Sequence, residues 1–377
     1  MPASHLYVHV PFCARRCIYC DFSIAVRHVV PVSDYLDGIR RELKGFVSSV
    51  TDLREDYSWR LNTLYLGGGT PSKLGGNGIA ALVDVVTDCA YLAPDAEVTI
   101  EANPEDVTPQ ALEAWTEAGI NRLSLGAQSF HDPVLTWMHR THDSKQIGEA
   151  VRLARAAGIY NISLDLIFAL PAGIERSWSD DLDAALGLEP QHLSLYGLTI
   201  EAATPLQRWT DRQRISPAGE DRYADEFLLA HERMSARGFT HYEVSNFALP
   251  GRESRHNSAY WSGVPYLGIG PAAHSFDGER RRWNVKSYAE WLRLVRSGDS
   301  AVEGHELLDS KNMASELVYL GLRTRDGYTI GPSGATDRAV AERWARAGWA
   351  VIDGDLVRLN PEGWLRLDTL AAGLTGH

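Results

Sequence analysis

The chain has 377 residues, of which 44% are hydrophobic and 23% charged, so it is long enough for one large domain with a smaller one attached. Its formal net charge is −12 at pH 7, which argues against a nucleic-acid-binding protein, because neutralising phosphates requires a basic surface. No apolar run approaches the roughly 20 residues of a membrane-spanning helix, and the N-terminus lacks the pattern of a signal peptide. The expected location is the cytoplasm.

Short β-rich segments alternate with amphipathic helical segments in the first 200 residues. The predicted strands are Leu6–Val10, Leu61–Leu66, Glu97–Ala102, Arg122–Gly126, Asn161–Leu170 and His192–Thr199. The predicted helices between them are Asp34–Val50, Gly78–Ala90, Pro109–Glu117, Ser144–Ala157 and Trp178–Leu186. Six β/α units in series require a parallel sheet with right-handed crossovers, a pattern that both a doubly wound sheet and a full or partial barrel satisfy.

The rhythm changes after Ile200, which predicts a division into three parts: a β/α core at 1–200, an extension of it at 201–303 and a C-terminal domain at 304–377. The extension is expected to contain, in order, a helix, a strand, a loop, a Gly-rich strand and a helix: Ala218–Arg237, His241–Phe247, Pro250–Pro265, Tyr266–Phe276 and Val285–Ser297.

The C-terminal part has the helix–helix–hairpin order of a winged-helix shape. Its predicted elements are Ser310–Leu320, Asp337–Ala347, Ala350–Ile352, Leu356–Leu359 and a last helix after Pro361. It carries eight Lys and Arg against ten Asp and Glu, a balance of −2, so we interpret it as a packing or partner-docking module rather than a DNA-binding domain.

Three of the four cysteines, Cys13, Cys17 and Cys20, lie within eight residues, directly after the first predicted strand. A Cys-x₃-Cys-x₂-Cys loop can place three thiolates at three corners of a [4Fe-4S] cluster, which leaves one iron open. S-adenosylmethionine can chelate that iron through its amino and carboxylate groups. The alternative is a zinc site with His28 as the fourth ligand. The fourth cysteine, Cys89, is expected to be a buried structural thiol.

The segment Tyr7–Phe22 resembles the opening of the radical-SAM superfamily, specifically of its coproporphyrinogen oxidase-like branch, and the resemblance extends over nearly the whole chain. It implies a partial (β/α)₆ barrel of the TIM type, with the cluster in the loop after the first strand. The active site is then expected at the C-terminal ends of the strands. The expected fold class is α/β, with a small winged-helix-like α+β domain at the C-terminus.

The resemblance also implies which residues bind S-adenosylmethionine. The motif Gly67–Pro71 lacks the Lys-Ser/Thr ending of a phosphate loop, and the matching family motif holds the methionine amino group. An arginine pairs well with the methionine carboxylate, and acidic side chains accept hydrogen bonds from ribose hydroxyls. The segment Gly268–Ala273 is expected to border the adenine. The residues predicted to bind S-adenosylmethionine are Tyr7, Gly69, Thr70, Glu101, Gln128, Arg140 and Asp165.

Two functions fit this branch. One is the oxygen-independent coproporphyrinogen III oxidase, which decarboxylates porphyrinogen propionates by radical chemistry. The other is a heme chaperone that binds heme and delivers it to apo-hemoproteins. Three features favour the chaperone: Phe22 stands where the oxidase motif has a further cysteine, five residues precede Leu6 where the oxidase has a longer extension, and 256–261 matches the His-Asn-x-x-Tyr-Trp motif of the chaperone group.

That motif suits heme chemically, because imidazole is a standard axial ligand of heme iron and aromatic rings offer flat surfaces for a porphyrin. The residues predicted to bind heme are His256, Asn257, Tyr260 and Trp261. The alternative iron ligands are His241 and His274, and the candidate partners of the heme propionates are Arg252, Arg255 and Arg280–Arg282.

The expected partners are heme, apo-hemoproteins as recipients, and a protein that donates electrons or heme. Contact with a membrane is expected only through a recipient, and no nucleic acid is expected. The scaffold is that of a radical-SAM enzyme, but coproporphyrinogen oxidase activity is not expected, and no catalytic residue is assigned.

Overall fold

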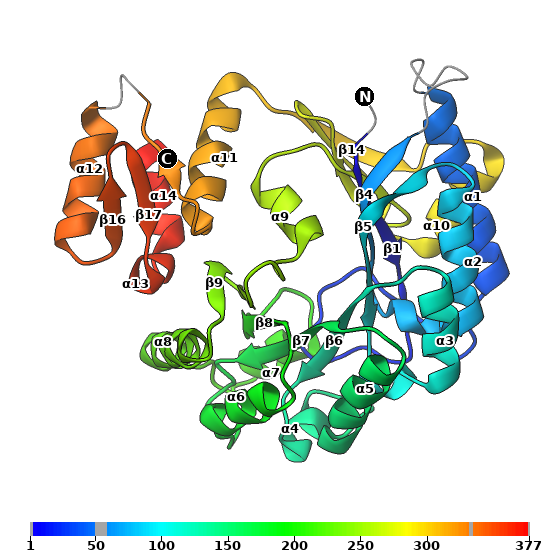
Figure 1. Cartoon of the computed structure of the whole chain (residues 1–377), viewed down its shortest axis with the longest axis horizontal. Coiled ribbons are helices and arrows are strands. Elements are labelled where there is room, and N and C mark those ends of the chain that lie inside the picture. Colours follow the sequence, from blue (N-terminus) through cyan, green and yellow to red (C-terminus); the bar gives the residue numbers. More distant parts are fainter. Residues whose placement is uncertain (1–2, 50–58, 332–334, 376–377) are drawn as a thin grey trace.

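One curved nine-stranded sheet organises the computed structural model, which describes residues 3–49, 59–331 and 335–375 (Figure 1). Its parallel core consists of strands in chain order: β1 (His5–Val10), β4 (Arg60–Gly68), β5 (Tyr91–Ala102), β6 (Arg122–Gln128), β7 (Asn161–Phe168) and β8 (His192–Gly197). These segments are rich in buried Val, Ile and Leu, as expected for strands covered on both faces. The six predicted strands are therefore confirmed, and β5 begins six residues earlier than expected.

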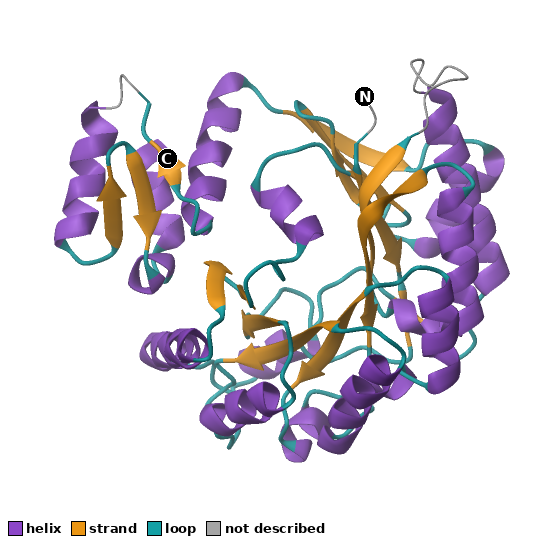
Figure 2. Cartoon of the chain, in the orientation of Figure 1, coloured by secondary structure: helices purple, strands orange, loops and turns teal. Residues whose placement is uncertain are grey.

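Helices follow the parallel strands and lie on the outer side of the curved sheet (Figure 2). They are α1 (Val32–Ser49), α2 (Gly75–Thr87), α3 (Pro109–Glu117), α4 (Asp132–Trp137), α5 (Ser144–Ala156) and α6 (Trp178–Gly187). Asp143 caps α5 in a reciprocal capping box with Gln146, and Thr108 and Ser177 cap α3 and α6, which explains where these helices begin. The predicted end of the first helix, Val50, lies outside the described residues.

The sheet has the order β11-β1-β4-β5-β6-β7-β8-β10-β9. On one edge β11 (Leu267–Ile269) runs parallel to β1. On the other edge β10 (Asn246–Ala248) runs antiparallel to β8, and β9 (Thr240–Glu243) runs antiparallel to β10. These added strands come from the extension, so it continues the sheet of the core. A parallel β/α sheet that curves without closing is a partial barrel, and the predicted fold class is confirmed.

Three predictions for the extension were wrong, and the first two concern strands. The segment His241–Phe247 is a hairpin rather than one strand, because the Glu243 carboxylate accepts hydrogen bonds from Ser245 N–H and the Asn246 amide and fixes a tight turn. The segment Tyr266–Phe276 divides into β11 and β12 (His274–Phe276), because Gly270 and Ala272 adopt φ angles of 99° and 60° and end the strand.

The predicted loop 250–265 contains a helix, α9 (Arg255–Trp261), which was missed. The Ser254 side chain accepts a hydrogen bond from Asn257 N–H, and the buried Glu97 carboxylate accepts from the N–H groups of Arg255 and His256. This cap comes from β5, far away in the sequence, so local patterns could not reveal it. Helix α9 lies within the curve of the sheet (Figure 1).

The remaining elements of the extension pack around this sheet. They are α7 (Pro205–Asp211), α8 (Glu220–Ala236), β13 (Arg280–Asn284), α10 (Tyr288–Ser297) and β14 (Val302–Leu307), which runs four residues past the predicted end of the extension at 303. Strands β12, β13 and β14 form a separate antiparallel sheet, and α10 packs against α1.

In its described residues, the C-terminal domain combines four helices with a small sheet of order β15-β17-β16. Its elements are α11 (Ser310–Arg323), β15 (Tyr328–Thr329), α12 (Ala335–Arg346), β16 (Ala350–Asp353), β17 (Leu356–Leu359), α13 (Pro361–Trp364) and α14 (Leu367–Thr375). Arg323 joins it to the barrel through an ion pair of 2.8 Å with the buried Glu243 of β9. None of the helices in the described ranges is long and apolar enough to cross a lipid bilayer.

Candidate functional site

The three clustered cysteines lie in a loop that leaves β1 and folds back on itself. Strands β2 (Phe12–Cys13) and β3 (Ala25–Val26) pair, and Ala25 N–H donates to the carbonyl of Pro11 at 2.7 Å. The loop is therefore closed around its thiols. All three are half-buried and line one cavity of about 560 Å³ at the C-terminal ends of the parallel strands, which we call the cysteine cavity.

The chemistry of these thiols fits an iron–sulfur cluster. Burial raises the pKa of Cys20 to about 11 and raises that of Cys13, so iron has to displace their protons. His28, the fourth ligand in the zinc alternative, is exposed and does not line the cysteine cavity. Three clustered cysteines, with His28 outside the cavity, are the ligand set of an open-iron cluster.

Six of the seven residues predicted to bind S-adenosylmethionine line the cysteine cavity: Gly69, Thr70, Glu101, Gln128, Arg140 and Asp165. They come from four different strands or the segments that follow them, and parallel strands bring those ends together. Tyr7 does not line the cysteine cavity: its hydroxyl is 3.1 Å from His9 Nδ1, and it lines an adjoining chamber together with Glu101. The binding role of all seven stays a prediction.

The glycine motif after β4 is shaped by the cysteine loop beside it. A Cβ atom at Gly69 would lie 2.8 Å from the carbonyl oxygen of Pro11, so a side chain does not fit against the backbone there. Gly68 adopts a φ of 117° and donates its N–H to Glu101 at 2.9 Å. The next residue, Thr70, places its hydroxyl 3.4 Å from Cys13 Sγ. The glycine motif thus contacts both the cysteine loop, through Thr70, and the Glu101 carboxylate, through Gly68.

Arg140 is held with its guanidinium in the cysteine cavity. Its Nη2 donates to Asn103 Oδ1 at 2.6 Å and to the Gly126 carbonyl at 3.0 Å, and its Nη1 lies 3.6 Å from Cys17 Sγ. Its Nε is buried and has no hydrogen-bond partner among the described residues. A fixed cation with a free donor beside the cysteines is suited to a carboxylate ligand.

Two partly buried carboxyls, Glu101 and Asp165, line the same cavity as Arg140. Glu101 accepts from the Tyr65 hydroxyl at 2.9 Å, and Asp165 accepts from Ser124 at 3.1 Å. Burial raises the pKa of Glu101 to about 7 and that of Asp165 to about 6. Near neutral pH each can accept a hydrogen bond from a ligand hydroxyl, which suits a ribose.

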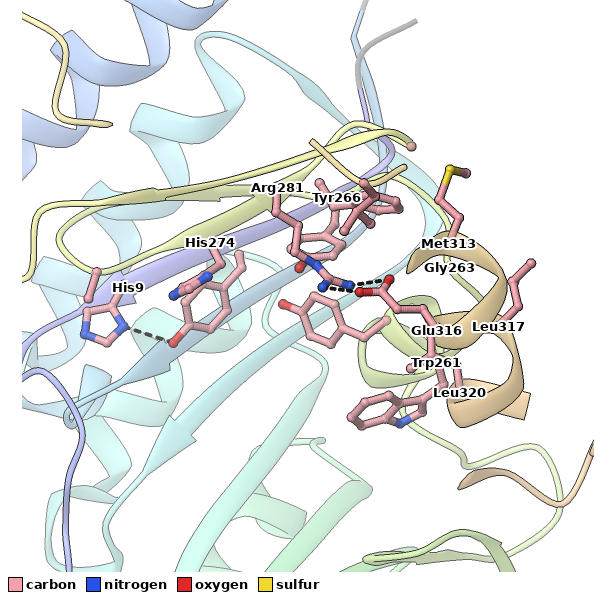
Figure 3. Close-up of a pocket in the computed structure, with 16 residues that line it drawn as sticks. His9, Trp261, Gly263, Tyr266, His274, Arg281, Met313, Glu316, Leu317 and Leu320 are labelled. Atoms are coloured by element: carbon pink, nitrogen blue, oxygen red, sulfur yellow. Dashed lines mark hydrogen bonds and ion pairs between the residues drawn. The ribbon is translucent and has the colours of Figure 1, made fainter. Parts of the chain in front are cut away.

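A second cavity of about 480 Å³ lies between α9, the sheet of β12 and β13, and α11, and we call it the α11 cavity (Figure 3). Its lining is mostly apolar and aromatic. The lining residues are Tyr7, His9, Tyr260, Trp261, Gly263, Tyr266, Ala272, His274, Phe276, Gly278, Arg281, Leu308, Met313, Glu316, Leu317 and Leu320. A third, more open chamber, lined by Tyr7, His9 and Glu101 among others, shares lining residues with both cavities and connects them.

The structure divides the predicted heme motif. Tyr260 and Trp261 line the α11 cavity, whereas Asn257 lines a small space inside the barrel and His256 packs on Tyr65 of β4. His256 is 1% exposed, and its two ring nitrogens lie 2.7 Å from the Thr63 hydroxyl and 2.8 Å from the Tyr260 hydroxyl. Burial lowers its pKa to about 3, so the ring is neutral and fully hydrogen-bonded. In this conformation neither nitrogen is free for iron.

The two alternative iron ligands, His241 and His274, also differ in whether they line the α11 cavity. His241 is buried, stacks on Phe247 at 3.8 Å and approaches the Val244 carbonyl with Nε2 at 3.1 Å. His274 lines the α11 cavity. Sequence reasoning missed most of this cavity, including His9, Tyr266, Met313 and Glu316, because its walls come from segments far apart in the chain and no local pattern joins them.

The fold and the cysteine cavity define a radical-SAM protein. The sequence profile of the Radical SAM superfamily matches residues 7–185. The structure is similar to that of coproporphyrinogen III oxidase (HemN) from Escherichia coli, described as a Radical SAM enzyme, with a TM-score of 0.83. The match covers 99% of this chain and 90% of that chain at 21% sequence identity, a level at which the likeness concerns the fold.

Curated relatives define the family more closely. The chain is 37% identical over 374 residues to the heme chaperone HemW of Mycobacterium tuberculosis, covering 98% of this chain and 94% of the relative. It is 37% identical over 340 residues to HemW of Escherichia coli, covering 85% and 87%, and 31% identical over 371 residues to HemW of Bacillus subtilis, covering 98% and 94%. The chain therefore belongs to the HemW-like family of the radical SAM superfamily.

Proposed function

We propose that this protein is a heme chaperone, which binds heme and delivers it to apo-hemoproteins. The observation that carries the proposal is the α11 cavity, an apolar, aromatic-lined space of about 480 Å³ bordered by Tyr260 and Trp261 of the chaperone-group motif. A pocket with apolar walls and a few placed polar groups is the usual form of a cofactor site. The relatives named heme chaperone HemW support the same function.

We further propose that Cys13, Cys17 and Cys20 hold a [4Fe-4S] cluster and that the rest of the cysteine cavity binds S-adenosylmethionine. When bound, the cluster supplies single-electron transfer and one iron open to an added ligand. Arg140 would bind the methionine carboxylate, and Glu101 and Asp165 would accept hydrogen bonds from the ribose. A protein that donates electrons or heme completes this proposal, and the cytoplasm suits it because thiolates persist in a reducing compartment.

The Phe22 side chain distinguishes this proposal from an oxidase function. It lines the cysteine cavity, is 60% exposed, and occupies the position of the further cysteine in the oxidase motif. Phenylalanine can neither ligate iron nor act as a thiol. We therefore expect no conversion of coproporphyrinogen III to protoporphyrinogen IX by the reduced, cluster-loaded protein with S-adenosylmethionine under anaerobic conditions. Turnover in this assay would contradict the proposal.

The direct test is a hemin titration of the cluster-loaded protein, followed by mixing with apomyoglobin as a generic acceptor. We expect saturable binding and transfer of the Soret absorbance to the acceptor. Tyr260→Ala should weaken binding about tenfold, because it removes an aromatic wall of the cavity. The matched control is Tyr160→Ala, since Tyr160 is 63% exposed and lies outside the cavity. Equal binding by the two variants, or no transfer, would contradict the proposal.

A further inference from the structure

We propose that heme occupies the α11 cavity with His274 as its iron ligand, while His256 positions the cavity wall without touching iron. This inference rests on the proposed function and specifies its site. It assigns different tasks to two histidines: one on strand β12, in the cavity, and one on helix α9, packed on Tyr65 of β4.

The hydrogen bonds of the nearby histidines carry the assignment. His9 is 6% exposed, and its ring nitrogens lie 3.1 Å from the Tyr7 hydroxyl and 3.0 Å from the Ser23 carbonyl. His256 is likewise occupied at both nitrogens. His274 is exposed toward the cavity, and neither of its ring nitrogens has a hydrogen-bond partner within the described residues. Iron ligation by His274 therefore breaks no existing interaction.

The environment of His274 keeps its imidazole neutral, as iron ligation requires. Partial burial lowers its pKa, and the positive charges of Lys286 and Arg281 lower it further. The ring also stacks on Trp283 of the neighbouring strand β13, with 6.0 Å between the centroids, which limits its orientations.

The walls of the cavity suit a flat apolar macrocycle. Tyr260 and Tyr266 meet edge to face with ring centroids 4.5 Å apart, and Phe276 continues this wall. Across the cavity, α11 presents Met313, Leu317 and Leu320, and Figure 3 shows Met313 and Leu317 on the side away from His274. Leu317 is 59% exposed, and an apolar ligand in the cavity would cover it.

The charges match the two carboxylates of heme. Arg281 lies on the wall of the α11 cavity, and Lys286 lines the connecting chamber together with His274. Arg281 forms a two-point ion pair with Glu316 of α11 across the cavity, with Nη2 and Oε2 2.7 Å apart (Figure 3). A heme propionate can replace Glu316 at this guanidinium, because both are carboxylates.

The role of His256 follows from the same geometry. Its Nε2 lies 2.8 Å from the Tyr260 hydroxyl, and Tyr260 lines the cavity, so His256 is a positioning residue. Its removal is expected to weaken heme binding while leaving the iron–histidine bond in the heme that does bind. Spectra separate this effect from the loss of the ligand itself.

The test compares hemin binding by full-length, cluster-loaded His274→Ala and His256→Ala proteins. His305→Ala is the control, since His305 is exposed on β14 and does not line the cavity. In His274→Ala we expect affinity to fall about tenfold, the absorption and electron paramagnetic resonance signature of histidine-ligated heme to disappear, and added imidazole to restore it. His256→Ala should keep the signature, and His305→Ala should behave as the unaltered protein.

The signature persisting in His274→Ala would overturn the inference, as would its loss in His256→Ala with the midpoint of thermal unfolding unchanged. These results leave the chaperone function standing. If the unaltered protein binds no hemin, the proposed function itself fails, so the two failures are distinguishable.

Discussion

Glu101 and Asp165 are carboxyls enclosed in the barrel, and the charge of Asp165 makes Glu101 harder to ionise. Burial is the first cause of their raised pKa values, and for Glu101 the negative charge of Asp165 adds to it. A carboxyl that binds its proton more tightly in the folded chain makes the fold less stable as pH rises from the unfolded pKa to the folded one. A cation bound in the cysteine cavity, such as a sulfonium, would relieve this repulsion.

For Glu101 the window runs from its ordinary value of 4.5 to about 7. In the metal-free protein we expect the free energy of unfolding to fall by on the order of 3 kcal/mol across that window because of this group. Glu101→Gln should remove this part of the decline, which denaturant titrations at the two ends of the window measure. Glu113→Gln, on an exposed site of α3, is the control. The same decline in Glu101→Gln and the unaltered protein would refute the explanation.

Gly69 allows a second prediction at the scale of the residue. A Cβ atom at this position would lie 2.8 Å from backbone atoms of Pro11. Pro11 begins the cysteine loop, so relieving the clash would require its backbone to shift. We expect Gly69→Ala to cost about 1–3 kcal/mol of stability and to lower the iron bound per chain after reconstitution. Gly45→Ala is the control, because nothing lies within 4 Å of a Cβ there. Full iron content in Gly69→Ala would show that the loop tolerates the displacement.

Helix α9 shows why some elements follow from the sequence and others do not. The parallel strands and their helices were predicted closely, because hydrophobic periodicity and N-caps such as Thr108 and Ser177 are local signals. The cap of α9 includes Glu97, more than 150 residues earlier in the chain. The cysteine cavity was predictable since parallel strand ends meet, whereas the α11 cavity depends on how the C-terminal domain packs.

The N-cap of α9 provides a test at this scale. Ser254→Ala removes the acceptor for Asn257 N–H and should cost about 1 kcal/mol of stability. Ser177→Ala removes the equivalent cap of α6, which contributes no residue to the α11 cavity, and should cost a similar amount. Only Ser254→Ala should also weaken hemin binding, because α9 carries Tyr260 and Trp261. Equal hemin affinity in the two variants would separate α9 from heme binding.

At the scale of the whole molecule, the C-terminal domain completes a cavity that the barrel begins. Its α11 supplies Met313, Leu317 and Leu320 to a space whose other walls belong to α9 and the second sheet. Arg323 and Glu243 anchor the base of α11 to the barrel, whereas Arg281 and Glu316 connect it across the cavity. The Arg323–Glu243 pair is well buried, whereas the Arg281–Glu316 pair is partly exposed. The Arg281–Glu316 pair is therefore the easier one to replace by an ion pair with a ligand.

This difference in burial predicts opposite effects on hemin affinity when Glu316 and Arg281 are replaced. Glu316→Gln removes the carboxylate that competes with a propionate for Arg281, so hemin should bind several-fold more tightly. Arg281→Gln removes the propionate partner, so hemin should bind several-fold more weakly, and the dependence of affinity on salt should decrease. Glu342→Gln on α12 is the control, because it carries the same charge change outside the cavity. Hemin titrations at low and high salt measure both effects. If Glu316→Gln weakened binding as Arg281→Gln does, the prediction would be wrong. Heme binding would then need the intact ion pair, and α11 would keep its position when heme enters.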